Sequence, residues 1–250
     1  MSIENHFGEI RQLPAPLRHL IADRLRSAIV SGLLKPGERL NESQLSKSMK
    51  ISRPSLREAI RQIESEGLVE VIPNVGPIVR QPPYEELLEI SDMTAVLGSL
   101  CARYFATNGT DEDVDRLDEA IDDVEAALKR GVVEDIRVAR EAYYQVYAKG
   151  SGSPLLARYL LQMLALTSSV RGSSLKVPGR PTEAVFEMRR IAEAIRNGDP
   201  ELAAAANMTF SQHAKMLIIK VMSKKGEGDE SPREPKAKAV RPKRVLKCPR

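Results

Sequence analysis

The sequence predicts a mainly α-helical protein, with a small N-terminal unit followed by an antiparallel bundle of six to seven helices. Apolar residues recur at helical spacing through most of the 250 residues, whereas the alternation typical of strands occurs only around residues 68–80. Between the two parts, Gln81-Pro-Pro-Tyr84 indicates a short, stiff linker. We therefore expect two domains, which is consistent with the length of the chain.

The first predicted helix covers residues 15–31. Pro16 suits the first turn of a helix, and Gly32 suits a C-terminal cap. Its inward face consists of apolar residues three and four positions apart, namely Leu17, Leu20, Ile21, Leu25, Ala28 and Ile29. A turn built on Pro36-Gly37 is expected after it.

Two further helices are predicted from their capping residues. Asn41 suits the N-cap of a short helix, with Gln44 as its capping-box partner, and Lys50-Ile51 forms the tight turn that follows. Ser52 caps the next helix and Gly67 ends it. The two helices and their turn have the spacing of a helix-turn-helix.

A β-hairpin is predicted directly after these helices. Two short strands, 68–72 and 78–80, flank Pro73-Asn-Val-Gly76. Asn74 and Gly76 tolerate the positive φ that a tight hairpin tip requires. Three helices and a hairpin are the parts of a winged helix-turn-helix domain, which we place at residues 14–81.

A basic stripe marks the third predicted helix. Arg53, Arg57 and Arg61 are spaced four residues apart, so a helix brings them to one face. The opposite face consists of the apolar residues Leu56, Ala59, Ile60 and Ile63. Arginines at this spacing also occur on solvated helix faces, but a capped helix-turn-helix with a hairpin favours a recognition helix for double-stranded DNA.

The same region carries a specific family resemblance. The matching segments are Gly32-Leu-Leu-Lys-Pro-Gly-Glu-Arg-Leu-Asn-Glu42, Leu45-Ser46, Ile51-Ser-Arg-Pro-Ser-Leu-Arg-Glu-Ala-Ile60, Glu66-Gly-Leu-Val69 and Pro73-Asn-Val-Gly76. In this order they resemble the GntR family of bacterial transcription regulators. The resemblance implies that Arg53, Arg57 and Gly76 touch operator DNA and that Arg61 contacts phosphate. The predicted DNA-binding set also includes Ser52, Ser55, Asn74 and Lys50.

Two positions depart from the family pattern. The turn of the helix-turn-helix usually carries glycine where this chain has Lys50. A positive φ there would cost roughly 1 kcal/mol, and the lysine would add a phosphate contact. The hairpin usually carries a basic or polar residue where this chain has Val75, so we expect weaker contact between the wing and the minor groove.

The rest of the chain is predicted to form an effector domain at residues 84–223. Its expected helices cover residues 84–107, 111–130, 133–149, 153–172, 181–197 and 199–223. Tyr143-Tyr-Gln-Val-Tyr147, Gly150-Ser-Gly-Ser-Pro-Leu-Leu156 and Ile195-Arg-Asn-Gly-Asp199 resemble the FCD-type domain of the FadR subfamily. That resemblance implies a helical bundle that binds a small molecule and forms a homodimer.

The metal ligands of that domain type are missing. Many members hold a divalent metal with one Asp and three His, but here Arg140, Tyr144 and Met188 occupy three of those positions. The chain has only three histidines, and His6 and His19 precede or belong to the first helix. We therefore expect no metal and no other cofactor.

Arg140 suggests a different way of holding an effector. A guanidinium can bind a carboxylate bidentately, and the phenols of Tyr144, Tyr143 and Tyr147 add hydrogen-bond donors. We predict that a small carboxylate or acyl ligand is bound there, with Met188 and Arg103 also lining the cavity. The alternative is that Arg140 faces solvent and the tyrosines only pack.

The charge is divided along the chain. Residues 1–82 carry 12 basic and 9 acidic side chains, a net of +3, and residues 83–222 carry 16 and 21, a net of −5. The remaining residues, 223–250, carry 10 and 4, a net of +6. We expect an N-terminal arm at 1–13 and a disordered basic tail at 224–250, which either grips DNA or only improves solubility.

The remaining features concern cellular location. The chain has no apolar run long enough to span a bilayer and no secretory signal at its N-terminus, and Cys101 and Cys248 belong to no paired motif. A cytoplasmic protein without membrane contact is expected.

These observations together predict a ligand-responsive repressor that binds a palindromic operator as a dimer. The alternatives are a non-specific architectural DNA-binding protein and an enzyme with a DNA-targeting head. No nucleophile with a base, no paired carboxylates and no metal spacing support the enzyme, so we do not expect one.

Overall fold

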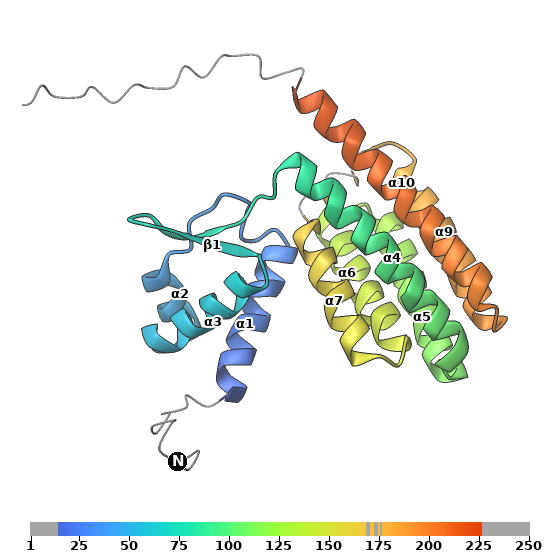
Figure 1. Cartoon of the computed structure of the whole chain (residues 1–250), viewed down its shortest axis with the longest axis horizontal. Coiled ribbons are helices and arrows are strands. Elements are labelled where there is room, and N and C mark those ends of the chain that lie inside the picture. The colour runs from blue at the N-terminus through green and yellow to red at the C-terminus, as the bar shows by residue number, and fades with distance from the viewer. Residues whose placement is uncertain (1–14, 169–170, 173–174, 176, 227–250) are drawn as a thin grey trace, which may run out of the picture.

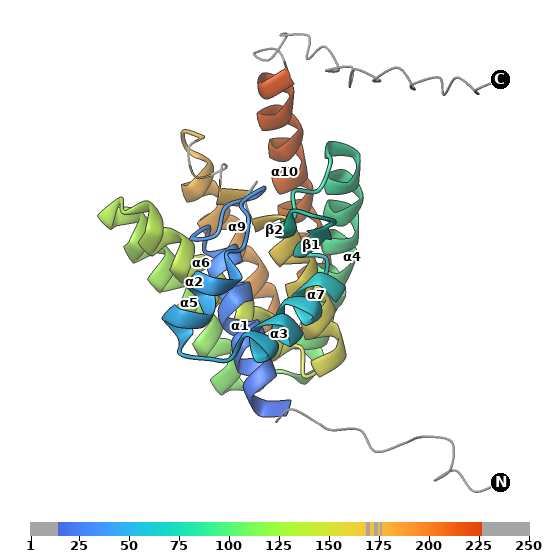
Figure 2. The same ribbon diagram turned by 90° about the vertical axis from the view of Figure 1, so that its left-hand side faces the viewer.

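The computed structural model describes residues 15–168, 171–172, 175 and 177–226. The predicted arm at 1–13 and residues 227–250 of the predicted tail lie outside this part of the chain. The mainly α-helical fold, with an N-terminal winged helix-turn-helix and a helical body, is confirmed. Figures 1 and 2 show the two parts side by side, with α7 on the side of the bundle that faces the N-terminal domain.

The elements follow the predicted order. The N-terminal domain consists of α1 (Ala15–Val30), α2 (Glu42–Met49), α3 (Arg53–Ser65), β1 (Val69–Ile72) and β2 (Gly76–Val79). The body consists of α4 (Tyr84–Asn108), α5 (Asp111–Arg130), α6 (Val133–Gly150), α7 (Pro154–Leu166), α9 (Arg180–Arg196) and α10 (Pro200–Gly226). Most boundaries lie within a few residues of those expected.

One helix is shorter than predicted. A single helix was expected over 153–172, but α7 ends at Leu166 and Thr167 leaves the helical geometry. The Thr167 hydroxyl hydrogen-bonds the carbonyls of Met163 and Leu164, at 3.3 and 3.2 Å. A threonine side chain that satisfies the backbone in this way competes with continuation of the helix.

The N-cap predictions for the helix-turn-helix are confirmed. The side chain of Asn41 accepts a hydrogen bond from the Gln44 backbone, and that of Ser52 accepts one from the Ser55 backbone. Lys50 adopts the left-handed conformation, with φ 54° and ψ 44°, as the C-cap of α2. The chain therefore makes the family's tight turn without the glycine that usually permits it.

The hairpin is closed more tightly than predicted. β1 and β2 pair antiparallel with Ile72 opposite Gly76, so the second strand begins at Gly76 and not at Ile78. Asn74 and Gly76 have φ of 65° and 99°, in agreement with the expected tip. Arg39 forms an isolated antiparallel bridge with Ile78, which ties the segment before α2 to the wing.

The N-terminal domain has its own core, which includes one residue of the body. Leu25, Leu56 and Ile63 are fully buried at its centre. Ala165 of α7 belongs to the same apolar cluster, and Leu166 packs against it. The Gln162 side chain also donates to the backbone carbonyl of Glu66 at 3.0 Å. The end of α7 is therefore part of the packing of both domains.

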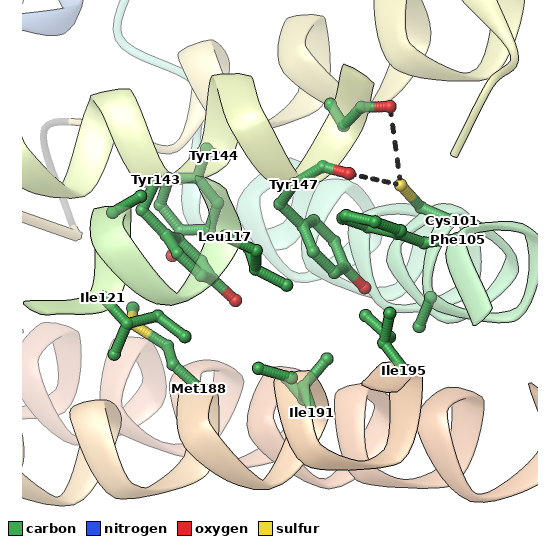
Figure 3. Packing of buried hydrophobic residues seen from close by; sticks show 14 of the residues in the cluster. Cys101, Phe105, Leu117, Ile121, Tyr143, Tyr144, Tyr147, Met188, Ile191 and Ile195 are labelled. Atoms are coloured by element: carbon green, nitrogen blue, oxygen red, sulfur yellow. Dashed lines mark hydrogen bonds between the residues drawn. The ribbon is translucent and has the colours of Figure 1, made fainter. Parts of the chain in front are cut away.

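The bundle core is dominated by aromatic and branched side chains between α4, α5, α6 and α9. Figure 3 shows Tyr143 and Tyr147 of α6 on the side of Met188, Ile191 and Ile195 of α9. Helices α4 and α10 also pack closely, because a Cβ on Gly98 would lie 2.6 Å from the Asn207 amide nitrogen. None of the described helices is long and apolar enough to cross a membrane.

Candidate DNA-binding surface and effector cavity

The amphipathic division of α3 agrees with the predicted recognition helix. Its apolar residues Leu56, Ala59, Ile60 and Ile63 are buried in the domain core, whereas Arg53, Arg57 and Arg61 are exposed. A helix with one packed and one basic face is the arrangement by which helix-turn-helix domains enter the major groove. The DNA contacts of the individual arginines remain predictions.

Each arginine of the stripe has a partner in the absence of DNA. Arg57 Nε donates to the Glu42 carboxylate at 2.7 Å, and Arg61 donates to Glu58 at 2.8 Å. Arg53 donates to the hydroxyl of Ser43 at 3.3 Å. Ion pairs this exposed contribute about 0–1 kcal/mol, so phosphate oxygens can replace the carboxylates at little cost.

The two serines beside the stripe have different surroundings. The exposed Ser52 caps α3, and its hydroxyl lies 2.8 Å from that of Ser55. Ser55 itself is buried, so the prediction that it contacts DNA is wrong. Its side chain points back to the cap because the N-terminal turn of α3 packs against the domain, and it shapes the start of the helix.

The wing tip presents a basic residue that sequence reasoning missed. Atoms of the Arg39 guanidinium lie 3.8 Å from the position that a Cβ on Gly76 would take. Arg39 is exposed and lies beside the wing because of its bridge to Ile78. Only the pairing of two segments nearly forty residues apart brings it there, so no local pattern identifies it.

The predicted effector residues Arg140 and Tyr144 lie together on α6. Arg140 Nε is buried and has no hydrogen-bond partner within the described part of the chain. Burial alone raises the pKa of the Tyr144 hydroxyl, but the charges of Arg140 and Arg171, with hydrogen bonds from both, bring it below its usual value. The alternative, in which Arg140 faces solvent, is therefore wrong for the Nε atom of its side chain.

Two further arginines join this site. The guanidinium of Arg171 lies over the Tyr144 ring, 4.7 Å from its centroid. Arg180 is 8% exposed, donates to Glu187 at 2.7 Å and lies 5.9 Å from the ring of Phe210. The interior of the bundle thus carries more positive charge than Arg140 alone would supply.

Small cavities adjoin these side chains. Three of them, of about 50, 30 and 20 Å³, share Tyr144 and Arg171 in their walls. Arg140 borders two of the three, and Arg180 borders one. A water molecule needs roughly 10–15 Å³ measured in this way, so the space holds a few waters or one small polar group.

Three other predicted effector residues lie elsewhere. Arg103 is on the outer face of α4, where it pairs with Glu201 at 2.7 Å, so the prediction that it lines the cavity is wrong. Tyr143 and Met188 are almost fully buried in the apolar core, and neither borders the cavities around Tyr144. Both residues lie on the core-facing side of their helices. Their distance from Arg140 along the sequence does not show which side of the helix they occupy.

Tyr147 has an intermediate position. It borders the largest of the three cavities, but its hydroxyl is already hydrogen-bonded, 2.8 Å from the Gly98 carbonyl and 2.9 Å from the Asn207 side chain. Burial raises its pKa well above the usual value. Tyr147 therefore forms a wall of the cavity and contributes no free donor to it.

The residues at this site do not suit a divalent metal. Guanidinium groups have no lone pair for coordination, and they repel a cation. Among the described residues, no three His, Cys, Asp or Glu side chains are grouped so as to hold a metal ion. His213, the third histidine of the chain, contacts Glu187 on the exposed side of α9 and α10. The donor set favours an anion.

Arg171 and Arg180 were not identified from the sequence. Arg171 falls within the stretch predicted as one long helix, and Arg180 at the end of a predicted loop. Arg180 and Glu187 lie seven residues apart, which is a weak signal of a pair along one helix face. No such signal connects Arg171 with Arg140.

Comparisons with known proteins agree with this division of the chain. The model of the gntR family of bacterial regulatory proteins matches residues 17–79, and the model of the FCD domain matches residues 89–212. The HTH-type transcriptional regulator YdhC of Bacillus subtilis is 27% identical over 202 residues, which are 80% of this chain and 90% of YdhC. The HTH-type transcriptional repressor RspR of Escherichia coli is 21% identical over 215 residues, 86% of this chain and 93% of RspR.

A solved structure shares the fold. The chain superposes on McbR/YncC of E. coli with a TM-score of 0.73 and 20% identity, covering 82% of this chain and 98% of that one. These matches are to regulators of transcription and not to enzymes, in agreement with the prediction that the chain is not an enzyme. The chain belongs to the GntR family of bacterial transcription regulators, with a DNA-binding winged helix-turn-helix domain followed by an FCD domain.

Proposed function

We propose that this regulator acts in the bacterial cytoplasm as a homodimeric repressor of the FadR type, which releases a palindromic operator when a small carboxylate binds in its FCD domain. The effector is held directly by arginine side chains, without a metal or another cofactor. The observation that carries this proposal is the buried Arg140 Nε, which has no partner within the described part of the chain and adjoins a cavity.

The DNA part of the proposal rests on the exposed stripe of α3. Arg53 and Arg57 are expected to contact bases and phosphates in the major groove, with Arg61 and Lys50 on phosphate. In a dimer, two such helices contact half-sites about one helical turn apart. Asn74 and Gly76 at the wing tip, with Arg39 beside them, are expected to approach the adjacent backbone.

An apolar stripe on the body supports the dimer. Met93, Val96, Leu100 and Tyr104 are exposed on α4 at intervals of three and four residues, so they lie along one helix face. A row of large exposed apolar side chains on a soluble protein is typical of an interface between subunits. The variant Val96→Glu should convert the dimer to a monomer in light scattering, whereas Val138→Glu, at an exposed valine of α6, should not.

The carboxylate is favoured by charge and by size. Arg140 and Arg171 both approach Tyr144, and two guanidiniums bind an oxyanion through charge-assisted hydrogen bonds. Cavities of tens of Å³ admit a compact ligand and not a large one.

The test begins with an unbiased selection of operator DNA by the purified protein, followed by footprinting. A discrete palindrome that is released by a small carboxylate supports the proposal, whereas uniform protection of any DNA supports the alternative of an architectural protein. Calorimetry with the releasing carboxylate should then show at least tenfold weaker binding to Arg140→Ala. Arg103→Ala, at an exposed arginine outside the cavity, is the matched control, and equal affinity of all three proteins contradicts the assignment of Arg140.

A further inference from the structure

The end of α7 connects the effector cavity with the DNA-binding domain. Leu164 borders the largest cavity around Tyr144. The next residue, Ala165, is buried in the core of the winged helix domain, and Leu166 packs against that core and lies near Gly67. Three consecutive residues therefore belong in turn to the cavity and to the neighbouring domain.

Arg171 stabilises this helix end. Its Nη2 donates to the backbone carbonyl of Leu164 at 2.6 Å, and the Thr167 hydroxyl donates to the same oxygen at 3.2 Å. Carbonyls in the last turn of a helix have no partner within the helix, and a cationic donor is a strong substitute. The same guanidinium lies over the ring of Tyr144, so the group that caps α7 also faces the cavity.

We infer that Arg171 couples the effector cavity to the DNA-binding domain, because a small oxyanion bound between Arg140 and Arg171 draws the Arg171 guanidinium away from the Leu164 carbonyl. This inference rests on the proposed effector site. A charged carboxylate or phosphate oxygen accepts a shorter and stronger hydrogen bond from a guanidinium than a neutral carbonyl does. The exchange needs only a shift of one side chain.

The consequence reaches the winged helix through packing. When the Leu164 carbonyl loses its cationic partner, the last turn of α7 is less stable, and Ala165 and Leu166 are less firmly held in the neighbouring core. Gln162, one turn earlier, also bonds the carbonyl of Glu66 at the end of α3. The placement of the recognition helix then changes, and with it the fit of a dimer to a fixed half-site spacing.

The first test needs no effector. Hydrogen exchange of the full chain is compared for wild type, Arg171→Gln and Arg158→Gln, the last at an exposed arginine of α7. The amides of residues 165–167 should exchange at least tenfold faster in Arg171→Gln, with no change in α5, while Arg158→Gln matches wild type. Exchange at wild-type rates in Arg171→Gln overturns the inference.

A conservative variant controls for the possibility that Arg171→Gln destabilises the whole fold. Arg171→Lys keeps the charge but lacks the planar fork of donors, so it should show a smaller increase at residues 165–167, about threefold. Faster exchange that extends equally to the amides of α5 in both variants would mean general destabilisation, and it would overturn the specific role of Arg171.

A second arm separates the inference from the proposed effector site. Acetate and inorganic phosphate are titrated against wild type and Arg171→Gln, and the response to one or the other identifies the oxyanion. In wild type the binding anion should accelerate exchange at residues 165–167, and in Arg171→Gln it should have no further effect. If neither anion binds wild type but Arg171→Gln still loosens α7, the oxyanion step is overturned together with the proposed effector site, and only the capping of α7 by Arg171 stands. An anion that binds both proteins and accelerates exchange equally in both overturns the coupling role.

Discussion

Replacing Lys50 with glycine should stabilise the protein and lower its affinity for DNA. Lys50 has φ 54° and ψ 44° at the C-cap of α2, and its side chain is exposed. The left-handed conformation costs an L-residue about 1–2 kcal/mol, and glycine avoids this strain. Glycine also gives the unfolded chain more freedom, which offsets about 0.5–1 kcal/mol. The expected net gain in the free energy of unfolding is about 0.5–1 kcal/mol.

Urea unfolding of the full chain measures this gain as a higher midpoint at unchanged slope. The control is Lys47→Gly, at an exposed lysine in the last turn of α2, where φ is helical and glycine should destabilise by about 1 kcal/mol. Opposite signs for two lysine-to-glycine changes three residues apart can arise only from backbone conformation. A loss of stability in Lys50→Gly would refute the assignment of strain to this turn.

The DNA arm of the same experiment tests the phosphate contact. Each neutralised phosphate adds about 0.9 to the slope of log affinity against log salt concentration. Lys50→Gly should therefore lower the slope for the selected operator by about 0.9. An unchanged slope would remove Lys50 from the DNA-binding set, whatever its effect on stability.

Three other predictions concern single side chains. Glu42→Gln removes the carboxylate that pairs with Arg57 at 2.7 Å. Operator affinity, measured by fluorescence anisotropy, should therefore rise about two- to fivefold, which is the free energy of an exposed ion pair. Weaker binding would mean that Glu42 orients the arginine for DNA. Tyr147→Phe removes the hydroxyl that bonds the buried Asn207 side chain and should lower the free energy of unfolding by about 1–3 kcal/mol, whereas the exposed Tyr159→Phe should have no effect. A neutral result for both variants would discount a stabilising role of that hydroxyl. Burial raises the pKa of the Cys101 thiol to about 12, so in a variant without other cysteines the native protein should resist a thiol reagent up to pH 10. Because an unfolded cysteine ionises near pH 8.5, stability from this group is complete below that pH and declines above it, and rapid native labelling at pH 9 would contradict the burial.

The sequence predicted the elements of this fold well because their determinants are local. Asn41 and Ser52 cap their helices through bonds to residues three positions away, and the arginine stripe follows from helical spacing alone. Thr110 likewise forms a full capping box with Asp113 at the start of α5. Such interactions depend on neighbours along the chain, so a pattern of residue types reveals them.

Errors arose where a side chain's surroundings come from distant segments. Arg140, Tyr144 and Met188 were grouped by their positions in a family pattern, and Tyr143 as their neighbour. Tyr143 and Met188 nevertheless border none of the three cavities around Tyr144. Helix α7 ends early at Leu166, where the Thr167 hydroxyl bonds two carbonyls of the last turn, and no proline or glycine in the sequence marks that end.

By itself, the sequence determined that this chain has a winged helix-turn-helix, that α3 presents arginines to solvent, and that three histidines are too few for the metal site of its domain type. The first two conclusions rest on helical periodicity and on capping and turn residues, and the third sets a residue count against the ligands that the family resemblance implies. Only the tertiary structure decided that Arg171 meets Arg140 across Tyr144 and that Ala165 lies in the core of the other domain. Both depend on how helices far apart in sequence pack and turn, which no local spacing specifies.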